Sequence, residues 1–501
     1  MSEQYGRHEP ARPADEDTNG LGRPSPRAPW EPERRAPRSG ASPWQDRLRT
    51  QLRFSGHTAS IPIVPPAAEK PEAGPSVPRV LDLALRTGEL LLASGEGGED
   101  VEAAMLGITD AYGLERCQPN VTFVAITLSY QPSLVEPPVT GERVVRRRAV
   151  DYTRLDEAHQ LVAAITGAEL TLEEAYHRLA DIRRNRHPYP RRLLLLSAGL
   201  IAAFASVMVG GGPIVALAAC VAALIGERLA QLLSDRGVPE FYQFVLASMP
   251  AAAITVLMIK VGVGINPYAV VTGGLFALLP GRALVAAVQD GLTGFYITAA
   301  ARLLEVFYLI VGIIVGISIV LYIGDRVGVQ FTVEGTFNLN ANPRIVQLLA
   351  AGGVSLTFAV LVQVRRVLLP VAAAGGAVGW AVFQVLREAG AAPVLATAVA
   401  TGLLGLLGQL LARWHGTSAL PYVIPAIGPM LPGSAMYQGM LALALGHTDT
   451  GWRSLVNAAS LALALAAGVN VGSEAARFVL PSPPPRTGRE MRPASKRTRG
   501  F

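Results

Sequence analysis

Charged residues are scarce in this sequence, and those present are concentrated near its two ends. Only 16% of the 501 residues are charged, and 50% are hydrophobic. A soluble domain normally carries about 25% charged residues. The charges crowd the first 190 and the last 30 residues and leave the centre nearly uncharged. This distribution argues against a globular enzyme and predicts a polytopic membrane protein with polar ends.

Several common site chemistries are also missing. The two cysteines, Cys117 and Cys220, lie far apart in different kinds of sequence, so neither a disulfide framework nor a cysteine-based metal site is implied. The seven histidines contain no pair with zinc spacing, and no Gly-Lys-Ser or Gly-Lys-Thr phosphate-binding loop occurs. The net charge of +6 comes with no basic patch interleaved with aromatics, so nucleic acid is not an expected partner. We therefore expect no metal, no cofactor and no catalytic residues.

Long uncharged stretches predict the membrane spans. A spanning helix needs roughly 20 residues. The first stretch, 193–226, is long enough for two short spans that turn at Gly210–Pro213, whereas 416–446 exceeds one span and is interrupted by prolines. The count is ten spans, five in each half, with the halves at 191–324 and 345–476. The remaining stretches are 241–259, 261–281, 306–324, 345–364, 367–386, 389–412 and 454–473.

The positive charges between spans predict an orientation. Cytoplasmic loops of membrane proteins carry an excess of Lys and Arg. The clusters fall on one side if both termini are cytoplasmic, and the opposite side then receives positive charges more thinly. We expect a multi-pass protein of the cell membrane with cytoplasmic N- and C-termini. The residues that indicate this are Arg191, Arg192, Arg228, Arg236, Arg365, Arg366, Arg413 and Arg477.

A tripeptide occurs twice inside the apolar sequence. Leu279-Pro280-Gly281 is followed by Arg282, and Leu431-Pro432-Gly433 is followed by Ser434. The two copies lie in predicted spans 4 and 9, an odd number of spans apart, so they should enter the membrane with opposite polarity. Inverted repeats with matching Pro/Gly breaks are typical of transporters, and the breaks point to the substrate site. The segments that follow, 283–301 and 434–446, are expected to be re-entrant or interfacial.

Polar residues after the breaks complete the predicted transport path. Intramembrane ionisable residues are costly and usually functional. Asp290 is the leading candidate for proton coupling and Glu305 the second, because a buried carboxyl can load and release a proton near physiological pH. The alternative is that these groups simply meet water and headgroups at the interface, and Arg282 either snorkels or binds a substrate carboxylate. The predicted path comprises Pro280, Gly281, Arg282, Gln289, Asp290, Arg302, Glu305, Pro432, Gly433, Ser434 and Gln438.

Two GxxxG patterns allow close helix contact, at Gly312–Gly316 and Gly468–Gly472. In spans this rich in Ala and Gly such patterns also arise by chance. Asn266, next to a proline, reads as a loop-to-helix cap.

Residues 76–187 predict a small α+β domain. Helices are expected over 81–92 and over 99–112, and a capping box at Thr171 and Glu174 should begin the last helix. Strands are expected at 121–128 and 143–150, and a helix from Leu155 to Gly167. The Gly95–Asp100 run is either a ligand loop or only a turn followed by the start of a helix. The tails, 1–75 and 477–501, are polar and are expected to be disordered.

Several of these motifs together resemble the threonine/serine exporter family. They span roughly residues 78–476. The motifs are Gly88–Gly95, Glu99–Glu102 and Tyr112–Leu114 in the N-terminal module; Leu279–Arg282, Gln289–Gly291 and Arg302–Glu305 at the end of the first membrane half; and Pro425–Ile427 and Leu431–Gly439 in the second half.

The resemblance implies a ten-span secondary transporter with a cytoplasmic N-terminal domain. Such a protein would export L-threonine and L-serine using the proton motive force, so its partners would be a small amino acid, protons and the lipid bilayer. Homo-oligomerisation is left open. Two alternatives remain at this point: a membrane-anchored, hydrolase-like enzyme, and a carrier or channel for another small metabolite. A duplicated pair of breaks favours transport, because an anchor needs no repeat.

Overall fold

A computed structural model describes residues 76–479, except 123, 134, 146–149, 185–188, 263–266, 277, 279, 330–341 and 416. The described residues belong to one compact unit, residues 57–501. The predicted tail 1–75 lies outside the described residues, as do residues 480–501 of the second tail and Asn266. Helix α17 continues to Val479, three residues into the predicted C-terminal tail.

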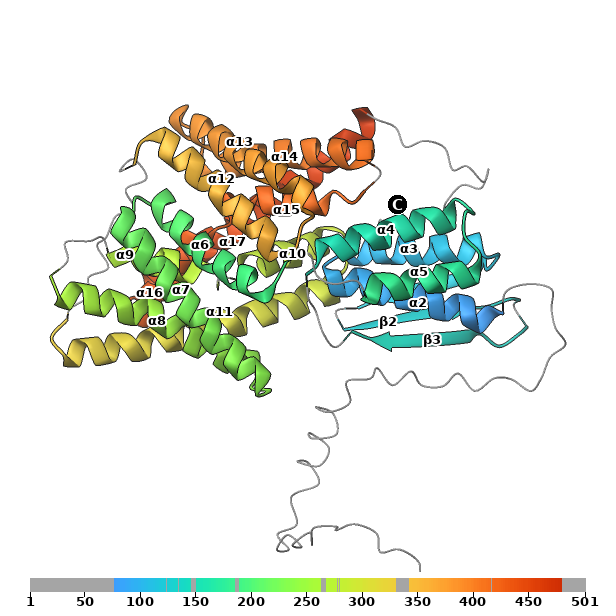
Figure 1. Cartoon of the computed structure of the whole chain (residues 1–501), viewed down its shortest axis with the longest axis horizontal. Coiled ribbons are helices and arrows are strands. Elements are labelled where there is room, and N and C mark those ends of the chain that lie inside the picture. The colour runs from blue at the N-terminus through green and yellow to red at the C-terminus, as the bar shows by residue number, and fades with distance from the viewer. Residues whose placement is uncertain are drawn as a thin grey trace, which may run out of the picture. The chain divides into compact units, whose positions relative to one another are not determined.

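The N-terminal α+β domain consists of helices packed on a small sheet (Figure 1). The sheet is antiparallel with the order β1-β2-β3. Its core is formed by aliphatic residues of the helices and of the buried face of the sheet. The elements are α2 (Val77–Ser94), α3 (Gly98–Ala111), β1 (Cys117–Val121), β2 (Ala125–Tyr130), β3 (Val139–Val144), α4 (Tyr152–Thr166) and α5 (Leu172–Arg184).

The predicted strands of this domain were placed wrongly, whereas its capping box is confirmed. The expected strand 121–128 contains a tight turn, because the Thr122 hydroxyl accepts a hydrogen bond from Ala125 N at 3.1 Å and Thr122 N donates to Ala125 O at 2.8 Å. The strand expected at 143–150 is β3, which lies at Val139–Val144, and 146–149 lie outside the described residues. The capping box exists, since Thr171 N donates to Glu174 Oε2 at 2.8 Å.

The remaining helices form two halves with the same order of long and short α-helices, and the second half also contains two 3-10 helices (Figure 1). The first half comprises α6 (Arg191–Met208), α7 (Pro213–Asp235), α8 (Glu240–Lys260), α9 (Pro267–Phe276), α10 (Gly281–Leu292) and α11 (Tyr296–Arg326). The second comprises α12 (Arg344–Leu361), η1 (Arg366–Leu368), α13 (Leu369–Glu388), α14 (Pro393–His415), α15 (Leu420–Ala426), η2 (Gly428–Met430), α16 (Gly433–Ala444) and α17 (Thr448–Val479).

Eight described helices are long and apolar enough to cross a membrane, namely α6, α7, α8, α11, α12, α13, α14 and α17. They confirm the predicted polytopic helical class. Predicted spans 4 and 9 instead consist of short helices on either side of each Leu-Pro-Gly tripeptide. The ten-span count therefore stays a prediction.

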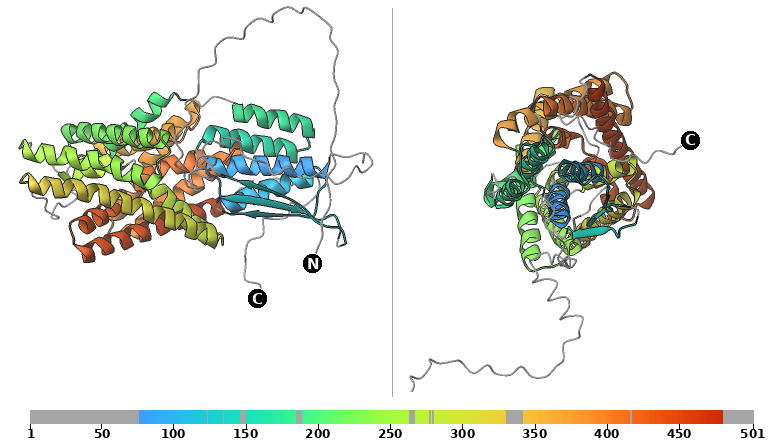
Figure 2. Two further views of the ribbon diagram at one scale, coloured as in Figure 1. Left: turned by 90° about the horizontal axis from the view of Figure 1, so that it is seen from below. Right: turned by 90° about the vertical axis from the view of Figure 1, so that its right-hand side faces the viewer.

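Glycines allow the long helices of each half to pack closely, as the GxxxG patterns suggested. Figure 2 shows these helices running alongside one another. A Cβ added at Gly316 of α11 would lie 2.2 Å from the Val245 carbonyl oxygen of α8, and one at Gly472 of α17 would lie 1.9 Å from the Gly402 carbonyl oxygen of α14. Because real Cβ atoms do not approach an oxygen so closely, only glycine fits at these crossings.

Candidate transport site

The Pro-Gly pairs of the two tripeptides take the same local structure. Pro280 caps α10 with φ −77° and ψ 35°, and Pro432 caps α16 with φ −74° and ψ 41°. Each helix is 12 residues long and is followed by a glycine with positive φ, Gly294 at 91° and Gly446 at 84°. Proline supplies a fixed φ at a helix start, and glycine supplies the left-handed residue that ends the helix.

The short helices pack against the last long helix of both halves. Helix α10 contacts α11 and also α17, and α16 contacts α17 and also α11. Side chains from all four helices contribute to one apolar core. The predicted breaks are therefore brought into one four-helix group, although each belongs to a different half of the sequence.

A buried ion pair lies in this group. Arg302 Nε of α11 is 3.2 Å from Asp290 Oδ2 of α10, and the two side chains are 11% and 4% exposed. The turn between the helices positions the pair, because Phe295 N donates to Asp290 O at 2.8 Å across Gly294. Two charges removed from water must be paired, so this site offers a fixed negative and a fixed positive group in apolar surroundings.

The other predicted path residues differ in burial. Pro280, Pro432 and Gly433 are buried, Gln289, Glu305 and Ser434 are half-buried, and Gln438 is exposed on α16. The burial of Gly281 and the side chain of Arg282 are not described by the structure, so neither prediction for Arg282 is tested.

The two glutamines are not structural counterparts. Counted from the capping prolines, Gln289 is matched by Leu441 and Asp290 by Ala442. Gln438 sits about one turn earlier in its helix. The second half has no acid at the place of Asp290, as expected, and the ion pair belongs to the first half alone.

Sequence reasoning missed a chain of amides that links the halves. Gln384 of α13 donates to Gln347 Oε1 of α12 at 2.6 Å, and Gln347 donates to the Asn342 carbonyl at 3.0 Å. The Asn342 side chain in turn donates to the Val207 carbonyl at 2.8 Å, at the end of α6. The signal available in the sequence was the presence of glutamines inside otherwise apolar spans, which need partners when buried.

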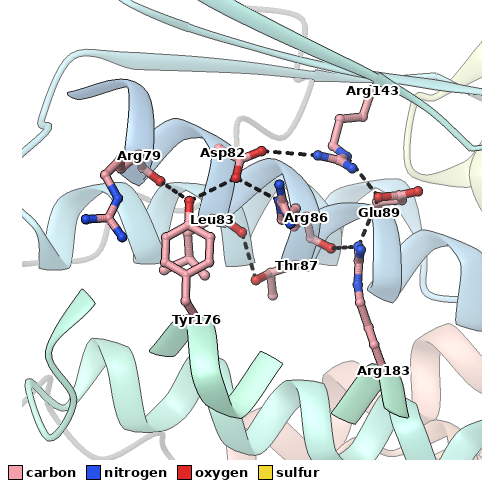
Figure 3. Close-up of polar contacts among 9 residues, drawn as sticks. All are labelled: Arg79, Asp82, Leu83, Arg86, Thr87, Glu89, Arg143, Tyr176 and Arg183. Carbon is pink, nitrogen blue, oxygen red and sulfur yellow. Dashed lines mark hydrogen bonds and ion pairs between the residues drawn. The ribbon is translucent and has the colours of Figure 1, made fainter. Parts of the chain in front are cut away.

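In the α+β domain, ion pairs connect α2 to the sheet and to α5 (Figure 3). Arg143 of β3 binds both Asp82 and Glu89 of α2, with its Nε 2.9 Å from Glu89 Oε2, and Arg183 of α5 binds Glu89 at 3.0 Å. Tyr176 donates to Asp82 Oδ2 at 2.9 Å. These contacts join secondary structure elements and leave Arg143 buried but paired, which indicates a structural network.

In the Gly95–Asp100 run, Gly95 to Gly97 form the turn between α2 and α3, and Gly98 to Asp100 begin α3. Gly95 adopts φ 104°, and Glu96 turns inward to pair with His159 of α4. Burial lowers the pKa of His159, but the hydrogen bond and charge of Glu96, with the charges of Asp100 and Asp156, outweigh it and raise the pKa above its ordinary value. The described residues contain no group of three His, Cys, Asp or Glu side chains that could hold a metal ion.

Comparison with known proteins identifies relatives over most of the chain. A family model described as "Putative threonine/serine exporter" matches residues 82–324, and one described as "Threonine/Serine exporter, ThrE" matches residues 347–474. The chain is 35% identical over 405 residues to a "Probable threonine/serine exporter" of Mycobacterium tuberculosis, covering 79% of this chain and 76% of the relative. It is 30% identical over 404 residues to a "Threonine/serine exporter" of Corynebacterium glutamicum, covering 79% and 82%. No solved structure matches.

Proposed function

This chain belongs to the threonine/serine exporter family, and we propose that it exports L-threonine and L-serine from the cytoplasm, driven by the proton motive force. It is a multi-pass membrane protein, and members of its family are transporters, so the hydrolase-like alternative falls away. The names of the two relatives support the choice of substrate. The other alternative, a carrier for another small metabolite, differs from this proposal only in the molecule that is transported.

The observation that carries the mechanism is the buried pair of Asp290 and Arg302 beside the first break. A free amino acid presents one ammonium group and one carboxylate, which match this acid and this guanidinium in charge. Arg binds carboxylates with a planar fork of donors, and Asp accepts from ammonium. In our proposal the pair opens to receive the zwitterion, and the charges of the protein and substrate satisfy one another away from water.

The same carboxyl would couple transport to protons. Protonation of Asp290 removes its charge and weakens its attraction for Arg302 and for the substrate ammonium, which favours release. The second half, with Ala442 at the equivalent place, contributes no acid to this step. Coupling therefore depends on α10 and α11.

We also propose that the halves are related by inverted orientation, with the α+β domain and both termini in the cytoplasm. The matched caps of α10 and α16, and their reciprocal packing on α17 and α11, support a two-fold relation between the halves. Single cysteines placed at Gly212 and Arg365, in a chain without Cys117 and Cys220, should be labelled from opposite sides of the membrane. Labelling from the same side would refute the inverted arrangement.

The test of the coupling role is Asp290→Asn in liposomes loaded with threonine. The variant should lose efflux driven by an imposed proton gradient. Exchange of threonine needs no net proton movement and should persist, but with a raised KM, because the amide attracts the substrate ammonium less than a carboxylate does. The control is Asp325→Asn, the same substitution at an exposed site near the far end of α11. Wild-type efflux with its usual pH dependence in Asp290→Asn would exclude this residue from coupling.

A further inference from the structure

The turn that follows α12, residues 362–365, is held by the α+β domain. Tyr152 N donates to the Val362 carbonyl at 3.1 Å, and Thr153 donates to the Gln363 carbonyl from its backbone N at 3.2 Å and from its hydroxyl at 2.7 Å. Tyr152 and Thr153 are the first residues of α4. The free N–H groups at the start of one helix thus satisfy the free carbonyls at the end of the other.

Further contacts fix this turn to the domain. The Tyr189 hydroxyl donates to the Val364 carbonyl at 2.7 Å, and Arg365 pairs with Asp156 of α4 at 3.2 Å. Ala359, Val362, Val364 and Ala372 belong to the same apolar core as the helices and sheet of the domain. The turn is therefore part of the interior of the domain.

Gln363 adopts a backbone conformation that normally requires glycine. Its φ is 57°, and its buried side-chain oxygen has no hydrogen-bond partner among the described residues. The corresponding turn after α6 has Gly210 at φ 93° with equivalent backbone bonds, from Gly210 N to Val207 O and from Gly211 N to Ser206 O. A residue other than glycine populates this left-handed conformation roughly five- to thirty-fold less than the right-handed one.

The helix that precedes the turn packs against both halves and against the segment before the second break. Helix α12 packs on α6 of the first half, and on α13, α15 and η2 of the second. Leu420 and Ile424 of α15, the segment that leads into the second break, also pack against the core of the domain. A shift of this turn would therefore reach both the contact between the halves and the second break.

We propose that the α+β domain serves transport by holding the α12–α13 turn in its strained, left-handed form, with Thr153, Tyr189 and Gln363 as positioning residues. This rests on the proposed export function. The domain supplies the hydrogen bonds that offset the strain at Gln363, and α12 and α15 keep their transport-competent positions only while the turn is held. Because Gln363 is strained, the turn keeps its conformation only with the support of the domain. A turn with glycine at this position would not need that support.

The first test weakens the hold without removing the domain. Thr153→Val with Tyr189→Phe deletes two hydroxyl hydrogen bonds while keeping side-chain shape, and should lower the maximal export rate about tenfold with an unchanged KM. The matched control is Thr166→Val with Tyr112→Phe. It makes the same changes in the same domain, where the hydroxyls bond to Val162 O and Leu170 O, and it should export at the wild-type rate.

The second test removes the strain. Adding Gln363→Gly to the weakened chain should restore most of the export rate, because glycine adopts the left-handed form without penalty. Gln363→Ala removes the same side chain but keeps the strain, and should restore nothing. Equal rates for the two variants, or wild-type export by the Thr153→Val, Tyr189→Phe chain, would overturn the proposal.

Hydrogen exchange separates this proposal from the choice of substrate. The amides of Val362 to Val364 should lose protection in the weakened chain and regain it with Gln363→Gly but not with Gln363→Ala, whether or not threonine is exported. Unchanged protection in the weakened chain would refute the hold itself. Absence of threonine and serine export by the wild-type chain, with the protection pattern as predicted, would refute only the proposed function.

Discussion

Replacing Arg302 by glutamine should destabilise the protein far more than replacing an exposed arginine of the same helix. Arg302 Nε lies 3.2 Å from Asp290 Oδ2 in the four-helix group, and both side chains are almost completely buried. The substitution leaves the Asp290 carboxylate in apolar surroundings without that guanidinium. The control is Arg326→Gln at the exposed end of α11, where the guanidinium contacts the Tyr322 hydroxyl.

The magnitude follows from the geometry of the pair. At 3.2 Å, the attraction is on the order of 5 kcal/mol at an effective dielectric constant of about 20. Desolvation offsets much of this when both charges are present, but breaking a buried pair by removing one partner costs about 3–5 kcal/mol. An exposed contact such as that of Arg326 is worth about 0–1 kcal/mol. The two variants should therefore differ by several kcal/mol.

The assay is equilibrium unfolding of the purified protein in lipid–detergent micelles. Arg302→Gln should lose about 3–5 kcal/mol, and the double variant Asp290→Asn, Arg302→Gln should recover more than half of that loss, because its neutral groups no longer leave a buried charge. The double variant should still fail to export. If Arg302→Gln were as stable as Arg326→Gln, the pair would not be buried as the structure has it, and the argument for a paired site would fail.

Three further predictions concern packing, pH and reactivity. Gly472→Ala should prevent α17 from packing, because its Cβ would lie 1.9 Å from a carbonyl oxygen of α14, whereas Gly212→Ala, with open space around it and φ −82°, should assemble normally by size-exclusion chromatography. The pKa of His159 is raised in the folded protein, so its contribution to the free energy of unfolding should be complete below about pH 6.5 and should disappear as pH rises through the raised pKa. Glu96→Gln should abolish this pH dependence of the unfolding free energy. Burial raises the pKa of the Cys117 thiol to about 11, so it should react with iodoacetamide at neutral pH about a hundredfold more slowly than an exposed cysteine, as mass spectrometry would measure.

The features set by local sequence could be predicted, and they include both breaks. Pro280 and Pro432 cap helices because proline has a fixed φ, and Gly316 and Gly472 lie at helix crossings because the spacing of GxxxG places them on one face. The error in the sheet has a local cause too. The apolar, β-branched run at 121–128 looks continuous, but the Thr122 hydroxyl closes a turn inside it.

The features that depend on distant contacts could not be predicted. Asp290 and Arg302 are both conspicuous in the sequence, but their pairing depends on the left-handed turn at Gly294. Gln438 is exposed and Gln289 is half-buried, a difference that depends on how α16 and α10 pack and not on the residue type. The hydrogen bond from Thr153 to the Gln363 carbonyl joins residues 210 positions apart in the chain, and no periodicity in the sequence predicts it.

Export itself is the central claim, and efflux from liposomes measures it most directly. Purified protein would be reconstituted into liposomes loaded with labelled L-threonine or L-serine. The external solution would be more acidic than the interior, so that protons move inward as the amino acid leaves. The account predicts efflux of both amino acids that is faster than from protein-free liposomes and that collapses when a protonophore removes the gradient. Efflux no faster than from protein-free liposomes would contradict the account.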